Sequence, residues 1–80
     1  DGGVKNGLPR AKAQRYAAQM LLGSAEMVLR TGRHPGQLKD EVCSPGGSTI
    51  AGVDALEQRA FRGSCIAAVE AAFEKTRRLG

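Results

Sequence analysis

The sequence has few of the residues that build a large hydrophobic core. Among its 80 residues only Tyr16, Phe61 and Phe73 are aromatic, and tryptophan is absent. A chain of this length buries roughly 60% of the surface that its unfolded state exposes. We therefore expect residues 1–80 to form one domain with a marginal core, which a partner would help to complete.

Residues that bind metals or form disulfide frameworks are also scarce. The sequence has two cysteines, Cys43 and Cys65, and one histidine, His34. No Cys-x-x-Cys pair occurs, so neither a zinc site nor a disulfide framework is expected. Both thiols are expected to be free and mostly buried as small hydrophobic groups. We expect His34 to cap or pack the turn before Pro35, since it has no partner for nucleophilic catalysis.

Charge of one sign is not concentrated anywhere in the sequence. The formal net charge is +4 and the pI is about 9.6, but the basic residues are dispersed. A nucleic-acid-binding protein would show a clustered basic stripe, so we expect no nucleic-acid partner. No apolar run is long enough to span a bilayer and no signal peptide is visible, so no membrane partner is expected. Because the sequence begins without methionine, we expect it to be part of a longer chain.

Helical periodicity dominates what is present. Residues 9–31 are predicted to form a long helix, with Pro9 at its first position and Gly32 at its end. Two adjacent, mainly apolar stripes follow helical spacing, one of Ala17, Leu21, Ser24 and Val28, the other of Ala18, Leu22, Ala25 and Leu29. An apolar arc this wide exceeds what a helix in a monomer buries, so the sequence predicts an oligomer.

Three further helices are predicted after Gly32. A short one runs from Pro35 to about Val42, and another runs from Ser48 or Thr49 to about residues 58–59. The last helix carries SCIAAVEAAF, and the residues expected to face inward there are Cys65, Ile66, Val69, Ala72 and Phe73. Because no segment alternates between apolar and polar residues with a period of two, the predicted fold class is all-α.

The segment CSPGGST, residues 43–49, interrupts this helical pattern. Pro45 ends the preceding helix, and Gly46 and Gly47 let a ligand approach the backbone. The next helix then begins with unpaired N–H groups and a partial positive charge, which suits a small anion. The same residues also fit a plain tight turn with Ser48 or Thr49 as a helix cap, so two interpretations stay open.

A family resemblance covers nearly the whole sequence. HPGQLKDEV followed by CSPGGSTIAGVDALEQRAFRG resembles the C-terminal signature region of pyrroline-5-carboxylate reductases, and GGVKNGLPRAKAQRYAAQMLLGSAEMVL resembles the helix that precedes it there. The resemblance implies a C-terminal helical domain that intertwines with a second copy to form a homodimer, and in the family dimers can assemble into larger rings. NADPH or NADH would be bound mainly by an N-terminal Rossmann domain, which agrees with the lack of a Gly-x-Gly-x-x-Gly motif here.

The resemblance also implies substrate contacts in the interrupting segment. In the family, 1-pyrroline-5-carboxylate is reduced to L-proline by hydride transfer to the imine carbon. The Ser44 hydroxyl and the N–H groups of Gly47 and Ser48 would hold the carboxylate, Thr49 would meet the ring nitrogen, and Val42 would pack near the ring. A threonine hydroxyl is a very weak acid, so we expect Thr49 to orient the imine rather than to act as a general acid.

These implications leave a second function class open. In that alternative the chain is a purely structural dimerisation module and makes no contact with substrate. In either case the chain alone is not expected to be active as an enzyme. A cytoplasmic location is expected, and a mitochondrial one remains open.

Overall fold

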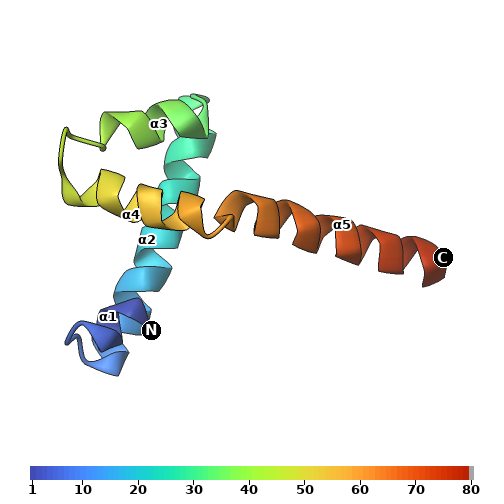
Figure 1. Cartoon of the computed structure of the whole chain (residues 1–80), viewed down its shortest axis with the longest axis horizontal. Coiled ribbons are helices and arrows are strands. Elements are labelled where there is room, and N and C mark those ends of the chain that lie inside the picture. The colour runs from blue at the N-terminus through green and yellow to red at the C-terminus, as the bar shows by residue number, and fades with distance from the viewer. Residues whose placement is uncertain (80) are drawn as a thin grey trace. The chain divides into compact units, whose positions relative to one another are not determined.

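The computed structural model describes residues 1–79, and all of its regular structure is helical (Figure 1). The prediction of an all-α fold is confirmed, because these residues contain no strand. None of their helices combines the length and the hydropathy that a membrane span requires. The elements in chain order are α1 (Gly2–Lys5), α2 (Arg10–Thr31), α3 (Pro35–Glu41), α4 (Ser48–Gln58) and α5 (Phe61–Leu79).

The chain divides into two compact units, one from Asp1 to Lys39 and one from Asp40 onward. The expectation of one domain over residues 1–80 stays a prediction. Each unit is small and most of its side chains are exposed, which agrees with the scarcity of large core residues in the sequence.

In the first unit, α1 packs against the start of α2. Ala13 is the one hydrophobic residue within residues 1–79 that is buried, with 8% of its surface exposed. A Cβ atom added to Gly3 would lie 3.1 Å from Leu8 Cδ1 and 3.4 Å from Ala13 Cβ, so the glycine lets the two helices approach. Helix α1 was not predicted, because a four-residue helix that begins with two glycines carries no periodic signal.

The ends of α2 follow from single residues. Pro9 has φ −58° and ψ 144°, so it is the N-cap residue and α2 begins at Arg10. The prediction that Pro9 is the first helical residue is therefore wrong by one position, because the ring fixes φ but leaves ψ free to be extended. Gly32 ends the helix as predicted, with φ 66° and its N–H donating to the Val28 carbonyl at 3.0 Å.

Both apolar stripes of α2 contain leucines that are largely exposed. Leu29 is 84% exposed and Leu21 is 65% exposed, while Val28 is half-buried. Exposed leucines on adjacent stripes of one helix are a large unburied apolar surface for so small a protein. The structure thus agrees with the sequence argument that this helix has more apolar surface than one chain buries.

A histidine caps the short helix α3. The Gly36 N–H donates to His34 Nδ1 at 2.9 Å, and the Gln37 N–H donates to the His34 carbonyl at 2.9 Å. Gly36 is needed for this contact, because an added Cβ would lie 3.0 Å from the same Nδ1. The prediction that His34 caps the turn before Pro35 is confirmed.

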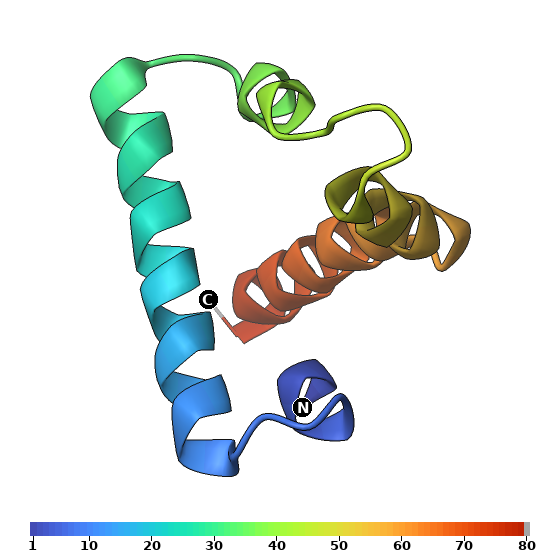
Figure 2. The same ribbon diagram turned by 90° about the vertical axis from the view of Figure 1, so that its left-hand side faces the viewer.

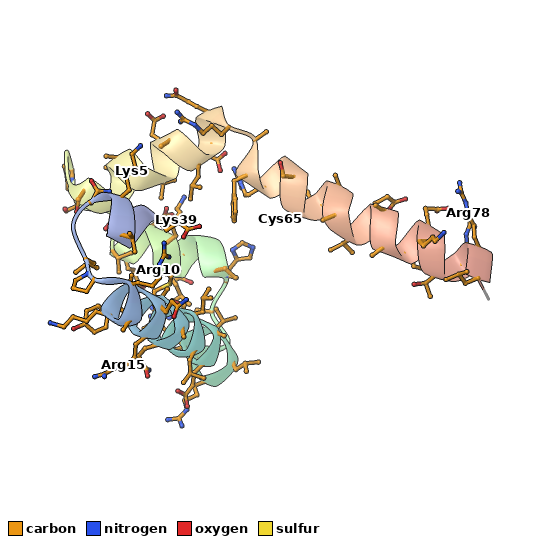
Figure 3. The ribbon with its side chains drawn as sticks, turned by 90° about the horizontal axis from the view of Figure 1, so that it is seen from below. Lys5, Arg10, Arg15, Lys39, Cys65 and Arg78 are labelled. Carbon is orange, nitrogen blue, oxygen red and sulfur yellow. The ribbon has the colours of Figure 1, made fainter. Side chains whose placement is uncertain are left out.

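In the second unit, α5 continues from α4 through Arg59 and Ala60 (Figure 1). Side chains project from α5 along its length, between the labelled Cys65 and Arg78, and no helix of its unit covers them (Figure 3). Ile66 is 71% exposed and Phe73 is 60% exposed.

Five residues of α5 were predicted to face inward, namely Cys65, Ile66, Val69, Ala72 and Phe73. That prediction is wrong for the single chain, where all five are exposed, because no helix of their own unit covers these side chains. Both thiols are free, as expected, but the expectation that they are buried is wrong for Cys65, which lies on this uncovered helix. Cys65 is exposed, and Cys43 is half-buried in the loop before α4.

Candidate functional site

The candidate site is the loop from Val42 to Gly47 together with the first turn of α4, which can be followed in Figure 2. Its centre is a β-turn, in which the Gly47 N–H donates to the Ser44 carbonyl at 3.0 Å. Pro45 holds the second turn position at negative φ, and Gly46 has φ 69° at the third. This combination defines a type II turn, which requires glycine or asparagine at the position of Gly46.

The Ser44 side chain lies against the backbone of Gly47. A Cβ atom added to Gly47 would overlap the Ser44 Oγ and would lie 3.2 Å from the Ser44 carbonyl oxygen. Gly47 has φ −82° and ψ 175°, which any residue adopts, so its backbone conformation alone does not require glycine. The lack of a side chain at Gly47 matters here for space, because the Ser44 hydroxyl occupies the position that a Cβ would take.

The first turn of α4 follows directly. Gly47 is its N-cap residue, and no side chain makes a capping hydrogen bond there. The interpretation of Ser48 or Thr49 as the cap is therefore wrong, since both lie inside the helix. The N–H groups of Ser48, Thr49 and Ile50 have no carbonyl four residues earlier within the helix, so they remain available to a ligand.

The structure changes one detail of the anticipated carboxylate contacts. The Gly47 N–H closes the turn onto Ser44, whereas the N–H groups of Ser48 and Thr49 face no intrahelical acceptor. Ile50, which the sequence analysis did not name as a site residue, adds a third such group. The unpaired N–H groups of a helix belong to the first residues after its N-cap. Ile50 could therefore have been predicted from the sequence if Gly47 had been recognised as the N-cap residue.

Val42 and the hydroxyl side chains complete the loop. Helix α3 ends at Glu41, one residue before the predicted end, and Val42 is 63% exposed. Ser44, Ser48 and Thr49 are all exposed to solvent. The loop thus places an apolar side chain, a serine hydroxyl and unpaired N–H groups within eight consecutive residues, 42–49.

Metal chemistry has no support in the described part of the chain. Within residues 1–79 no group of three or more His, Cys, Asp or Glu residues could hold a metal ion. The chemical features that remain at the loop are hydrogen-bond donors and the positive end of a helix dipole. These features are of the kind that suits a small anion.

Comparison with known proteins identifies one family. The family model described as "Pyrroline-5-carboxylate reductase dimerisation" matches residues 1–79. A pyrroline-5-carboxylate reductase from Synechocystis is 55% identical over 80 residues, which is 100% of this chain and 30% of that protein. Pyrroline-5-carboxylate reductase 2 from Bos taurus is 58% identical over 79 residues, which is 99% of this chain and 25% of that protein.

A solved structure gives the same result for the fold. The crystal structure of Plasmodium falciparum pyrroline carboxylate reductase with NADP bound matches with a TM-score of 0.94 and 44% sequence identity. The match covers 100% of this chain and 32% of that one. The chain therefore spans about a third or less of the length of these relatives.

Proposed function

Because the chain belongs to the pyrroline-5-carboxylate reductase dimerisation family, we propose that it is the C-terminal helical domain of an enzyme that reduces 1-pyrroline-5-carboxylate to L-proline. The observation that carries the proposal is the turn at residues 44–47. It leads directly into the unpaired N–H groups of α4, with the Ser44 hydroxyl packed on Gly47. A ring carboxylate matches these donors in charge and in size.

In this proposal the carboxylate lies at the first turn of α4. The Ser48 N–H and the Ser44 hydroxyl donate to its oxygens, and Gly47 contributes chiefly by having no side chain that would displace the Ser44 hydroxyl. The Thr49 and Ile50 N–H groups add to the positive end of the helix dipole. Charged acceptors make these hydrogen bonds stronger than those between neutral groups.

Thr49 then orients the ring. Its hydroxyl holds the nitrogen of the imine, and Val42 packs against the ring carbons, so that the imine carbon is presented to the cofactor. NADPH or NADH supplies the hydride when bound. Positioning of this kind lowers the barrier by several kcal/mol without any ionisation of threonine. The proton on nitrogen arrives with the substrate or from water.

The cofactor and the second chain complete the enzyme. Dinucleotide binding requires a strand and a glycine-rich turn before a helix, and residues 1–79 contain no strand. We infer that an N-terminal domain holds the cofactor and that this chain alone is inactive. The exposed apolar surfaces of α2 and α5 support a homodimer. Assembly of dimers into rings and a cytoplasmic or mitochondrial location stay predictions.

A titration separates this function from a purely structural dimerisation module. Isothermal titration of the full-length protein, saturated with cofactor, would use a proline-like ring carboxylate as the ligand. We expect saturable binding that is lost in Ser44→Ala combined with Thr49→Val. A matched control is Ser64→Ala, which removes an exposed hydroxyl in α5, away from the loop. Equal binding by both variants would favour the structural module.

Two substitutions at Thr49 test the orienting role. Thr49→Ser keeps the hydroxyl and should retain most activity. Thr49→Val keeps the shape and should lower kcat/KM by roughly 10- to 1000-fold, or about 1.4 to 4 kcal/mol. In a pH profile, the limb that reports imine protonation should persist in Thr49→Val at reduced height, because threonine does not titrate near neutrality. Wild-type activity of Thr49→Val at every pH would show that the residue has no substrate role.

A further inference from the structure

The junction between α4 and α5 holds a non-glycine residue in the left-handed conformation. Ala60 has φ 56°, and within residues 1–79 no other non-glycine residue has positive φ. Its N–H donates to the Glu57 carbonyl at 3.1 Å, and its carbonyl accepts the Ser64 N–H at 2.8 Å. Arg59 is the C-cap residue of α4, and the left-handed Ala60 after it directly precedes α5, so the chain changes direction within two residues.

An ion pair spans this change of direction. Arg62 donates to Glu57 through Nε at 2.9 Å and through Nη2 at 2.7 Å, so that two parallel hydrogen bonds join the last turn of α4 to the first turn of α5. The hydrogen bond to Glu57, and then its charge, raise the pKa of the Arg62 guanidinium. A two-pronged arginine–carboxylate contact fixes orientation as well as distance.

Each of the two charges lies at the end of its helix where the helix dipole disfavours a charge of that sign. A negative Glu57 in the last turn of α4 and a positive Arg62 in the first turn of α5 both oppose the dipole of the helix that carries them. Neither position is therefore favoured by local helix stability. Their mutual contact across Ala60 is a favourable interaction that offsets these unfavourable positions.

What the junction directs is the apolar side of α5. Ile66, Val69 and Phe73 are more than half exposed, and α5 contacts α4 in its unit. The bend between α4 and α5 therefore decides in which direction α5 presents these side chains relative to α4. A small change of angle at one end of a 19-residue helix becomes a large displacement at the other.

We propose that the Glu57–Arg62 pair is a salt-sensitive latch that fixes the bend between α4 and α5 and so directs the apolar side of α5 toward its partner. The Arg62 and Glu57 side chains are 79% and 45% exposed, so dissolved ions reach both. At a salt concentration near 1 M, the Debye length is about 3 Å, so the attraction between two exposed charges is substantially screened. The latch loosens as ionic strength rises, and dimerisation weakens with it.

The test measures the bend directly by pulsed EPR in the full-length protein. Cys43 and Cys65 are replaced by serine, and spin labels are attached to cysteines placed at Ala51 and Lys75. An excess of unlabelled chain ensures that each dimer carries one labelled copy. A variant that dissociates is measured as the monomer, where the width of the distance distribution has the same meaning.

Four variants separate the latch from other effects of charge. Glu57→Gln and Arg62→Gln should each broaden the distribution at low salt and abolish its dependence on salt. The exchange of both charges, Glu57→Arg with Arg62→Glu, should restore a narrow distribution, because it keeps the attraction and also suits both helix dipoles. Glu74→Gln is the matched control, since it removes an exposed pair with Arg77 that lies wholly within α5.

Sedimentation of the same proteins measures the effect on assembly. The two single variants should weaken dimerisation by about two- to tenfold at low salt, the range expected when each chain of a dimer loses one exposed pair. The exchanged pair should recover it, and Glu74→Gln should leave it unchanged. A wild-type distribution that is already broad, or one that neither 1 M salt nor Glu57→Gln alters, would overturn the proposal. Its failure would leave the substrate site untouched, because the latch involves none of the loop residues.

Discussion

Replacing Gly47 with alanine would add one methyl group where the Ser44 hydroxyl now lies. The added Cβ would overlap Ser44 Oγ, so the serine side chain must turn away. The Gly47 backbone, at φ −82° and ψ 175°, accepts alanine without strain. Loss of glycine at an N-cap costs about 0.5 to 1 kcal/mol. The fold should therefore survive, while the position of the serine hydroxyl should not.

Gly47→Ala should weaken substrate binding more than it lowers the stability of the fold. A hydrogen bond to a charged carboxylate contributes about 1.5 to 3 kcal/mol, so its loss should raise the KM for 1-pyrroline-5-carboxylate by about tenfold or more. The KM for the cofactor should stay within about twofold, because no loop residue is proposed to contact it. Steady-state kinetics of the full-length protein, with each substrate varied in turn, measures both constants.

Two controls make this prediction specific. In Ser44→Ala the hydroxyl is already gone, so adding Gly47→Ala should raise the substrate KM little further, and the two effects should be clearly non-additive. Gly46→Ala instead forces a side chain into φ 69° and should lower stability by about 1 to 2 kcal/mol. A rise in the cofactor KM with an unchanged substrate KM in Gly47→Ala would refute the assignment of the loop to the carboxylate.

Two further predictions concern stability and assembly. Ala60→Gly relieves the left-handed strain at φ 56° but gives the unfolded chain more freedom. We expect the free energy of unfolding to rise by about 0.5 to 1 kcal/mol, which corresponds to roughly 2 to 8 °C in Tm. A lower Tm in thermal unfolding would contradict this explanation. Ile66→Asn places a polar group on the 71% exposed apolar side of α5 and should shift the chain toward monomer in light scattering, whereas Lys75→Asn on the same helix should not. A compact wild-type monomer at micromolar concentration would remove the basis for the dimer.

The sequence by itself determined the helices and the place of the candidate site. The signals that predicted them are local. The helical period of apolar residues marks the helices, and Gly32, Pro45, Gly46 and Gly47 act through their own backbone angles. They placed the end of α2 at its observed residue and the start of α4 within one residue. Only α1 was missed, because four residues give no period to read.

Only the tertiary structure shows the role of a residue that acts through contact with another residue. The sequence indicated that Gly47 leaves room for a ligand, but only the structure shows that the Ser44 hydroxyl fills the place of its side chain and that its N–H is used by the turn. Likewise Glu57 and Arg62 are five positions apart, which is not a spacing that pairs side chains on one helix. Their contact exists because Ala60 turns the chain between them.

The inward face predicted for α5 is another case in which the sequence alone was not sufficient. Its apolar residues recur with helical spacing, so the sequence determined that one face of α5 should be buried. A period identifies the face but does not name the surface that covers it. In the single chain that face is open to solvent, because the remaining helices of its unit do not reach it. The spacing of apolar residues thus determines which residues need burial, and only tertiary structure decides that their own unit leaves them exposed.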